Sequence, residues 1–425
     1  MTRTVVSRLF GRILKEFSLL ILPLLVFAPL ARSQDAVRPS LAGEAASEAR
    51  QQDVERIPYN LLVGPVRFRF SATVGVEYND NITLAQHDER QDDIIFRPQV
   101  NFDAIWPITQ LNTLRLDLGI GYSAYVMHPH NDTDAILLSP GSQIAFDIFV
   151  GDFRINIHDK MSLQQDPISE PAISNTADYG RFENTAGISV LWDLNKVQAT
   201  LGYDHYNFIS TTEQFDYINH NSEILSGSLS FAVASNTNIG VEGTGVYTYY
   251  NENILNDSRD ASGGGFIETQ VSSYFRLRLA GGYQWIGFDN NGLVNDQSDV
   301  NDYYANILLT HRLNAMLSQS IAAGHENQLG INSNSIRLNY VRHTITWNVV
   351  RNTLLTTEFF FEDGNESGGF IDEHFHRVGA AGTIGYQLTP HVTLGLRYQY
   401  TQKYSDSPGR NYIQNRVSVD GTYSF

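Results

Sequence analysis

The chain has 425 residues, of which 42% are apolar, 12% aromatic and 18% charged, and it contains no cysteine. This composition excludes collagen, a disulfide-stapled scaffold and a polytopic helical membrane protein, which needs several apolar runs of about 20 residues. A chain without cysteine also has no thiolate catalysis and no zinc–thiolate site.

A single long apolar run occupies residues 18–30, directly after a basic stretch. The run is short, contains two prolines and is followed by the small residues of Ala31-Arg32-Ser33. These features predict a cleaved secretory signal peptide over residues 1–33, with a retained signal anchor as the alternative. Residues 34–60 are polar without a buried-face pattern, which predicts a flexible periplasmic leader.

The charge of the exported chain is strongly acidic. Cleavage of residues 1–33 removes five basic residues and Glu16, which leaves 24 basic against 45 acidic residues and a net charge of −21. Because phosphate binding depends on Lys and Arg, this balance argues against a nucleic-acid partner.

Apolar and polar residues alternate through the rest of the chain. Every second residue from Val66 to Tyr78 is apolar, and residues 114–122, 392–400 and 417–425 repeat this pattern. A period of two is typical of a β-strand with two different faces. We count about eighteen such segments, each of about 10 to 15 residues.

The connections between these segments alternate in length. Short turns around residues such as Gly151-Asp152 and Thr389-Pro390 separate nine longer polar loops. The long loops are predicted near residues 79–92, 126–135, 165–180, 209–220, 250–260, 289–301, 326–334, 363–371 and 405–410. Outer-membrane barrels have short periplasmic turns and long external loops, whereas a soluble sandwich has no reason to separate short and long connections onto two ends.

In hydrocarbon only a closed sheet satisfies every backbone amide of a set of β-strands. We therefore predict an all-β fold, a transmembrane antiparallel up-and-down barrel of about 18 strands, over residues 61–425.

Three stretches resemble the outer-membrane β-barrel porin families of Gram-negative bacteria. They are Gly64-Pro-Val-Arg-Phe-Arg-Phe70, Gly75-Val-Glu-Tyr-Asn-Asp-Asn-Ile82 and the terminal Tyr423-Ser-Phe425. The resemblance implies an outer-membrane location among lipid and lipopolysaccharide, and assembly by the barrel assembly machinery through the strand that ends at Phe425. Some relatives accompany exopolysaccharide export machinery. Porins of sixteen or eighteen strands are often trimers, so a homo-oligomer is also implied.

The strand pattern turns many charged side chains toward the inside of the barrel. One interpretation is a basic wall that faces acids elsewhere and sets a transverse field, and the other is a set of ion pairs that satisfies a polar interior. The predicted pore-lining residues are Arg67, Arg69, Glu77, Arg97, Asp103, Arg115, Asp117, Arg397, Arg416 and Asp420. Residues 165–180 form the longest loop, which we expect to constrict the lumen.

We found no motif for catalysis or for a bound cofactor. HExxH, GxSxG and Walker sequences are absent, so no enzymatic activity, cofactor or metal site is predicted. Residues 128–134 hold two His and two Asp, but we interpret them as a solvated loop. His374-Phe-His376 places two imidazoles on one strand face, which we attribute to strand register.

These observations predict a porin-like outer-membrane channel for the passive diffusion of small polar solutes or ions. The predicted external loops are rich in Asp and Glu, and an acidic outer rim favours cations at the entrance. An alternative is that the acids only keep the surface solvated. Two further alternatives concern function: a component of an exopolysaccharide export system, and a surface barrel without transport.

Overall fold

The structure is a computed structural model, and it describes residues 59–133, 136–293 and 299–425. The predicted signal peptide and the leader up to residue 58 lie outside the described residues, so both stay predictions. Within the described part of the chain, no helix has the length and hydropathy of a membrane-spanning helix.

The described residues form twenty strand segments and four short 3-10 helices. The strands are β1 (Leu61–Val63), β2 (Val66–Asn79), β3 (Asp93–Pro107), β4 (Thr113–Gly121), β5 (Ala124–Tyr125), β6 (Leu137–Val150), β7 (Phe153–Gln164), β8 (Arg181–Asp193), β9 (Val197–Ser210), β10 (His220–Ala234), β11 (Thr237–Tyr250), β12 (Ser258–Ser272), β13 (Phe275–Phe288), β14 (Val300–Arg312), β15 (Leu317–Leu329), β16 (Ser333–Val350), β17 (Thr353–Gly369), β18 (Glu373–Thr389), β19 (Val392–Ser405) and β20 (Tyr412–Ser424). The helices are η3 (His87–Glu89), η4 (Pro129–Asn131), η5 (Pro167–Ser169) and η6 (Glu213–Ile218).

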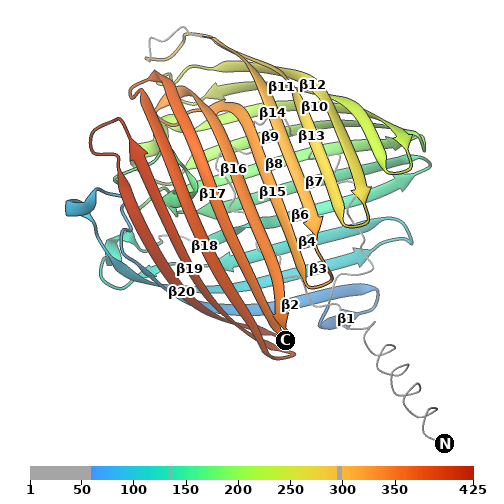
Figure 1. Ribbon diagram of the computed structural model, residues 1–425, viewed down its shortest axis with the longest axis horizontal. Coiled ribbons are helices and arrows are strands. Elements are labelled where there is room, and N and C mark those ends of the chain that lie inside the picture. Colours follow the sequence, from blue (N-terminus) through green and yellow to red (C-terminus); the bar gives the residue numbers. More distant parts are fainter. Residues whose placement is uncertain (1–58, 134–135, 294–298) are drawn as a thin grey trace, which may run out of the picture.

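These strands close into one antiparallel barrel (Figure 1). Each long strand pairs with the long strands before and after it in the chain, so that β4 pairs with β3 and β6, and β2 also pairs with β20, with Ser71 opposite Ser424 and Asn79 opposite Arg416. Because β4 and β5 together make one interrupted strand and β1 only extends the start of β2, the barrel has 18 strands. The predicted fold class is confirmed.

The outward face of the barrel is apolar. Val74 and Val76 are each about half exposed, and they alternate with inward-facing Gly75 and Glu77. Exposed aromatic residues gather near both ends of the strands, as in the interfacial girdles of outer-membrane barrels. Trp106, Trp192 and Trp347 lie near the short-turn end, and Tyr247 and Trp285 lie near the loop end.

The short turns join the strands at one end of the barrel, where the carboxyl terminus also lies (Figure 1). Several of these turns need a backbone conformation in the left-handed region. Gly151, Asn195 and Asn352 have φ angles of 59°, 73° and 67°. Gly and Asn tolerate this region better than other residues, which explains their place in these tight hairpins.

Two of the predicted long loops are wrong. The connections near residues 326–334 and 363–371 are only three residues long, since β15 runs to Leu329, β16 begins at Ser333 and β17 runs to Gly369. The polar residues there continue the strand ladder beyond the apolar band instead of forming loops, and many of their side chains are buried inside the barrel. Polar composition alone therefore did not distinguish a projecting strand from a loop.

The apolar outward face generates a stability prediction. Val100 lies in the middle of β3, opposite Ala72 and Ile120, and 54% of its surface is exposed. An Arg in hydrocarbon costs about 2 to 4 kcal/mol near the bilayer midplane. Val100→Arg should lower the free energy of unfolding in lipid vesicles by about that amount. The neighbouring inward substitution Gln99→Arg should lower it much less, and equal losses for the two variants would contradict the assigned faces.

Candidate functional site: the lumen and its inward loop

The ten residues predicted to line a pore all alternate with outward apolar residues and therefore lie on the inner face. Arg97, for example, follows the exposed Phe96, and Arg397 lies between the exposed Leu396 and Tyr398. The same alternation applies to Arg67, Arg69, Glu77, Asp103, Arg115, Asp117, Arg416 and Asp420. That they line a conducting pore stays a prediction.

Charges on the inner face are paired between nearby strands. Arg115 and Arg154 both approach the buried Asp147, at 3.2 Å each. Arg278 pairs with Glu242 at 2.7 Å. Arg397 pairs with Glu358 at 3.4 Å. These contacts favour the interpretation that ion pairs satisfy a polar interior over the interpretation of separated basic and acidic walls.

The inward loop, residues 165–180, connects β7 to β8 and folds into the barrel. It begins with η5, where the Asp166 carboxylate accepts a hydrogen bond of 3.1 Å from the Ile168 amide. Most of its residues are buried, although the loop joins two strands at the external end. The loop therefore lies within the lumen, as its length predicted.

Apolar side chains of the inward loop pack against several parts of the wall. Ile168 packs with Leu84 and Tyr412, and Ala172 lies in a cluster with Phe375. Other loop residues, Ile173, Ala177 and Tyr179, belong to two further clusters that include inward side chains of β3, β9, β10 and β11. The external part of the lumen therefore has an apolar core of its own.

Polar side chains from across the lumen hold the backbone of the inward loop. Arg377 on β18 donates to the carbonyl of Ile168 at 2.8 Å. The carbonyl of Ala172 accepts hydrogen bonds from Arg410 and, at 3.3 Å, from Asn332. A buried carbonyl without a donor is costly, so these contacts stabilise the docked loop.

Asp166 attaches the start of the inward loop to two arginines of the inner wall. Its carboxylate lies 2.8 Å from Arg416 and 3.8 Å from Arg97, and both arginines also contact Glu77. Burial alone would raise the pKa of Asp166, but Arg416 and Arg97 outweigh burial and hold this pKa below its usual value. Asp166 therefore stays ionised at neutral pH.

A cavity of about 290 Å³ lies between the inward loop and this wall. Four of the predicted pore-lining residues meet there, whereas the other six lie elsewhere on the inner face. The residues that line it are Glu77, Arg97, Gln164, Asp166, Ile168, Ser169, Arg397, Gln399, Arg416 and Ser418. Each of the three arginines on this lining has a carboxylate partner, because Arg97 and Arg416 contact Glu77 and Asp166 and Arg397 contacts Glu358.

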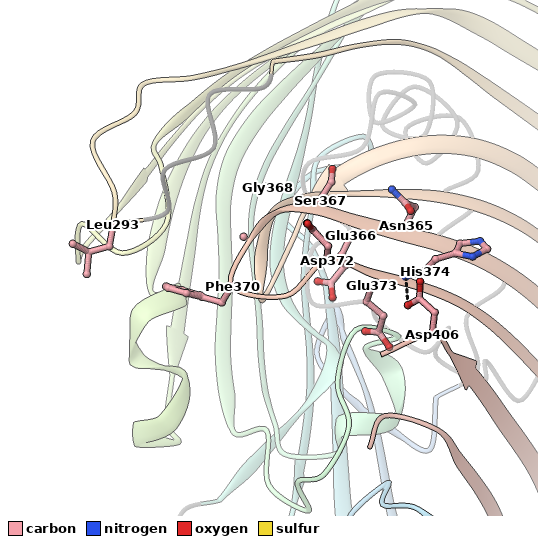
Figure 2. Close-up of a pocket in the computed structure, with 11 residues that line it drawn as sticks. Leu293, Asn365, Glu366, Ser367, Gly368, Phe370, Asp372, Glu373, His374 and Asp406 are labelled. Carbon is pink, nitrogen blue, oxygen red and sulfur yellow. Dashed lines mark hydrogen bonds between the residues drawn. The ribbon is translucent and has the colours of Figure 1, made fainter. Parts of the chain in front are cut away.

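A second cavity, of about 760 Å³, lies at the tip of the β17–β18 hairpin (Figure 2). Glu373 on its lining is fully buried and pairs with Lys403 at 2.9 Å and with Arg410 at 2.8 Å. Lys403 also lies within 3.5 Å of the Ser174 hydroxyl in the inward loop. These charges therefore support the loop, and we place the candidate site at the smaller cavity inside the lumen.

The structure brings possible metal-ligating side chains together in another place than residues 128–134, where the sequence has its densest group of His and Asp. His128, which the sequence had placed in a solvated loop, contacts Asp93 at 2.9 Å. Among the described residues, one set of three side chains brings its ligand atoms within 4.8 Å of one another, and it consists of Asp363, His374 and His376. The pair of histidines was visible in the sequence, but the strand register that adds Asp363 was not.

A closed barrel that is apolar outside and polar inside, with a loop that narrows its lumen, is the architecture of porin-like outer-membrane channels. Residues 62–425 match the family described as Putative beta-barrel porin 2, and the chain belongs to that family. The resemblance to the porin families seen in the sequence is thus confirmed.

Solved structures of similar fold include porins of Pseudomonas. OpdF (OccK2) from Pseudomonas aeruginosa, crystallised with glucuronate, has a TM-score of 0.50 and 11% identity, covering 86% of this chain and 100% of that chain. A BenF-like porin from Pseudomonas fluorescens Pf-5 has a TM-score of 0.49 and 11% identity, covering 84% and 99%. Identity this low shows the fold alone. No curated protein sequence matches this chain.

The ionised Asp166 generates a prediction about pH. Because its pKa is lowered in the folded protein, its contribution to loop docking is complete above the usual carboxyl pKa of about 4 and is lost as the pH falls further. The protection of residues 165–180 from hydrogen exchange, taken relative to the intrinsic exchange rate at each pH, should stay high from pH 7 to about 4 and fall below that. Asp166→Asn should accelerate this exchange already at neutral pH, and a loss of protection between pH 7 and 5 in the unaltered protein would contradict the assignment.

Proposed function

We propose that this protein is an outer-membrane channel for the passive diffusion of small polar solutes or ions. The observation that supports it most directly is the lumen, which is lined by polar and charged side chains and narrowed by the inward loop. An apolar outer surface with aromatic girdles suits a barrel in a lipid bilayer. The family of the chain supports the same conclusion, and it supports the outer membrane as the location.

The inward loop is the part of the channel that we expect to limit passage. Selectivity in such pores comes from the pore radius, the lining and the rim charge, and no catalytic group is needed. The cavity of about 290 Å³ beside the loop is at the lower end of the size of small-molecule sites. Arg97, Arg397 and Arg416 would contact a solute there, which favours polar solutes. The small volume of the cavity favours small solutes over polymers.

Assembly of the channel is part of the proposal. The carboxyl-terminal strand β20 closes the barrel against β2, and Phe425 follows it directly. We expect the barrel assembly machinery to recognise this strand, and lipid and lipopolysaccharide to surround the finished barrel.

Conductance in planar lipid bilayers tests the role of the inward loop. The purified protein should form open channels, and Asp166→Asn should raise their conductance several-fold because it removes the contacts to Arg97 and Arg416. Asp88→Asn is the control, since the Asp88 side chain is fully exposed on an external loop and should have no such effect. A protein that never conducts would refute the channel, whereas equal conductance of both variants and the parent would refute only the role of Asp166.

Ion selectivity tests the acidic outer rim. Carboxylates at the entrance concentrate cations within a Debye length, about 10 Å at 0.1 M salt. The reversal potential in a KCl gradient should therefore show a weak cation preference. Neutralising the exposed Asp88 and Asp92 together should reduce this preference, while Asp152→Asn at the short-turn end should leave it nearly unchanged. An anion preference of the parent protein would contradict the proposed role of the rim.

A further inference from the structure

Three side chains on the outward face of the barrel converge on one point near its external end. His374 Nε2 lies 2.9 Å and His376 Nδ1 lies 3.0 Å from the same carboxylate oxygen, Asp363 Oδ1. The two rings meet edge to face with their centroids 4.7 Å apart. All three ligand atoms lie within 4.8 Å of one another. The cluster is outside the lumen and takes no part in the proposed passage of solutes.

The register of two strands creates this cluster. Asp363 on β17 lies directly opposite His376 on β18. His374 is two residues before His376, so its side chain points to the same face. The neighbouring residue Glu373 points to the other face and is buried inside the barrel, and Figure 2 shows His374 and Glu373 on opposite sides of the hairpin.

A neighbouring strand orients the carboxylate of Asp363. Asn339 on β16 donates a hydrogen bond of 3.0 Å to Asp363 Oδ2, which leaves Oδ1 directed at the two imidazoles. The side-chain amide oxygen of Asn339, Oδ1, lies 2.7 Å from Nδ1 of His325 on β15. Partners of this kind, which hold the second oxygen of a ligating carboxylate, are typical of metal sites in proteins.

The cluster lies just outside the apolar band of the barrel. On β17 the outward residues Phe359 and Phe361 are exposed and apolar, and the next outward residue is Asp363. The ring of Phe361 stacks on that of His376 at a centroid distance of 6.1 Å. The side chains of His374 and His376 are each 47% exposed, so an ion in solution can reach them.

We propose that Asp363, His374 and His376 form a binding site for a divalent transition-metal ion, with Zn²⁺ as the best fit. Two imidazole nitrogens and one carboxylate oxygen are ligands that zinc accepts, whereas Ca²⁺ and Mg²⁺ prefer oxygen ligands alone. Bonds of about 2.0 to 2.1 Å in a tetrahedral site place ligand atoms about 3.3 Å apart. The two His–Asp distances are already close to that value, so small side-chain rotations complete the arrangement. Water occupies the fourth position, which faces outward.

Isothermal titration of the full chain without a polyhistidine tag, folded in detergent micelles, tests this site. Zn²⁺ should bind with one dominant site per chain. His374→Ala and His376→Ala should each weaken that site at least tenfold, and Asn339→Ala, which only removes the orienting hydrogen bond, should weaken it about tenfold. Millimolar Ca²⁺ or Mg²⁺ should not compete. X-ray absorption at the zinc edge should show two imidazole ligands in the parent and one in either His variant.

The matched control is His205→Ala. His205 on β9 also pairs with a carboxylate on the next strand, at 3.0 Å from Glu223, but no third His, Asp or Glu among the described residues joins this pair as a ligand. Its removal should leave the dominant site unchanged. Zinc affinity that is the same in His374→Ala, His376→Ala and the parent would overturn the proposal, as would a parent protein that binds no zinc. All variants change outward side chains that are at least partly exposed, and circular dichroism and electrophoretic mobility before and after heating verify that they fold.

Discussion

The pairing of backbone amides in hydrocarbon is the constraint on which the rest of this structure depends. An unpaired amide inside a bilayer costs several kcal/mol, so a sheet that crosses the membrane has to close on itself. Here closure joins the first long strand to the last, β2 to β20. Closure also separates the two strand faces into an outer surface and an interior. Polar side chains then have to lie inside the barrel. Buried charges there are compensated by opposite charges, as Asp147 is by Arg115 and Arg154.

The inward loop is stable inside the lumen because both its apolar and its polar groups find partners there. Ile168 and Ala172 are buried against the wall, and their carbonyls accept hydrogen bonds from Arg377, Arg410 and Asn332. The single carboxylate at its start lies between Arg97 and Arg416. The apolar contacts supply a non-directional attraction, whereas the hydrogen bonds and ion pairs fix where the loop rests.

Much of the fold follows from local patterns that a reader of the sequence can recognise. The period of two, the alternation of short and long connections and the inward direction of residues such as Arg97 depend only on neighbours in the chain. The wrong prediction of long loops near residues 326–334 and 363–371 shows the limit of this approach. A strand that projects beyond the apolar band has the same polar composition as a loop. The partners of the inward loop were also invisible, since Arg377 and Ile168 are far apart in sequence and meet only after the barrel has closed.

The β17–β18 hairpin illustrates how much chemistry depends on register. Beyond the apolar band its inward residues Glu366 and Glu373 are buried near Arg410 and Lys403, which hold the inward loop, while Asp363 and His374 point outward. Successive residues of one strand thus serve the lumen and the outer surface in turn. A slip of one residue in β18 would move the buried carboxylate to the surface and bring an imidazole into the charged interior. The ion pairs of Glu373 oppose such a slip, so the contacts that hold the inward loop also keep the outward histidines opposite Asp363.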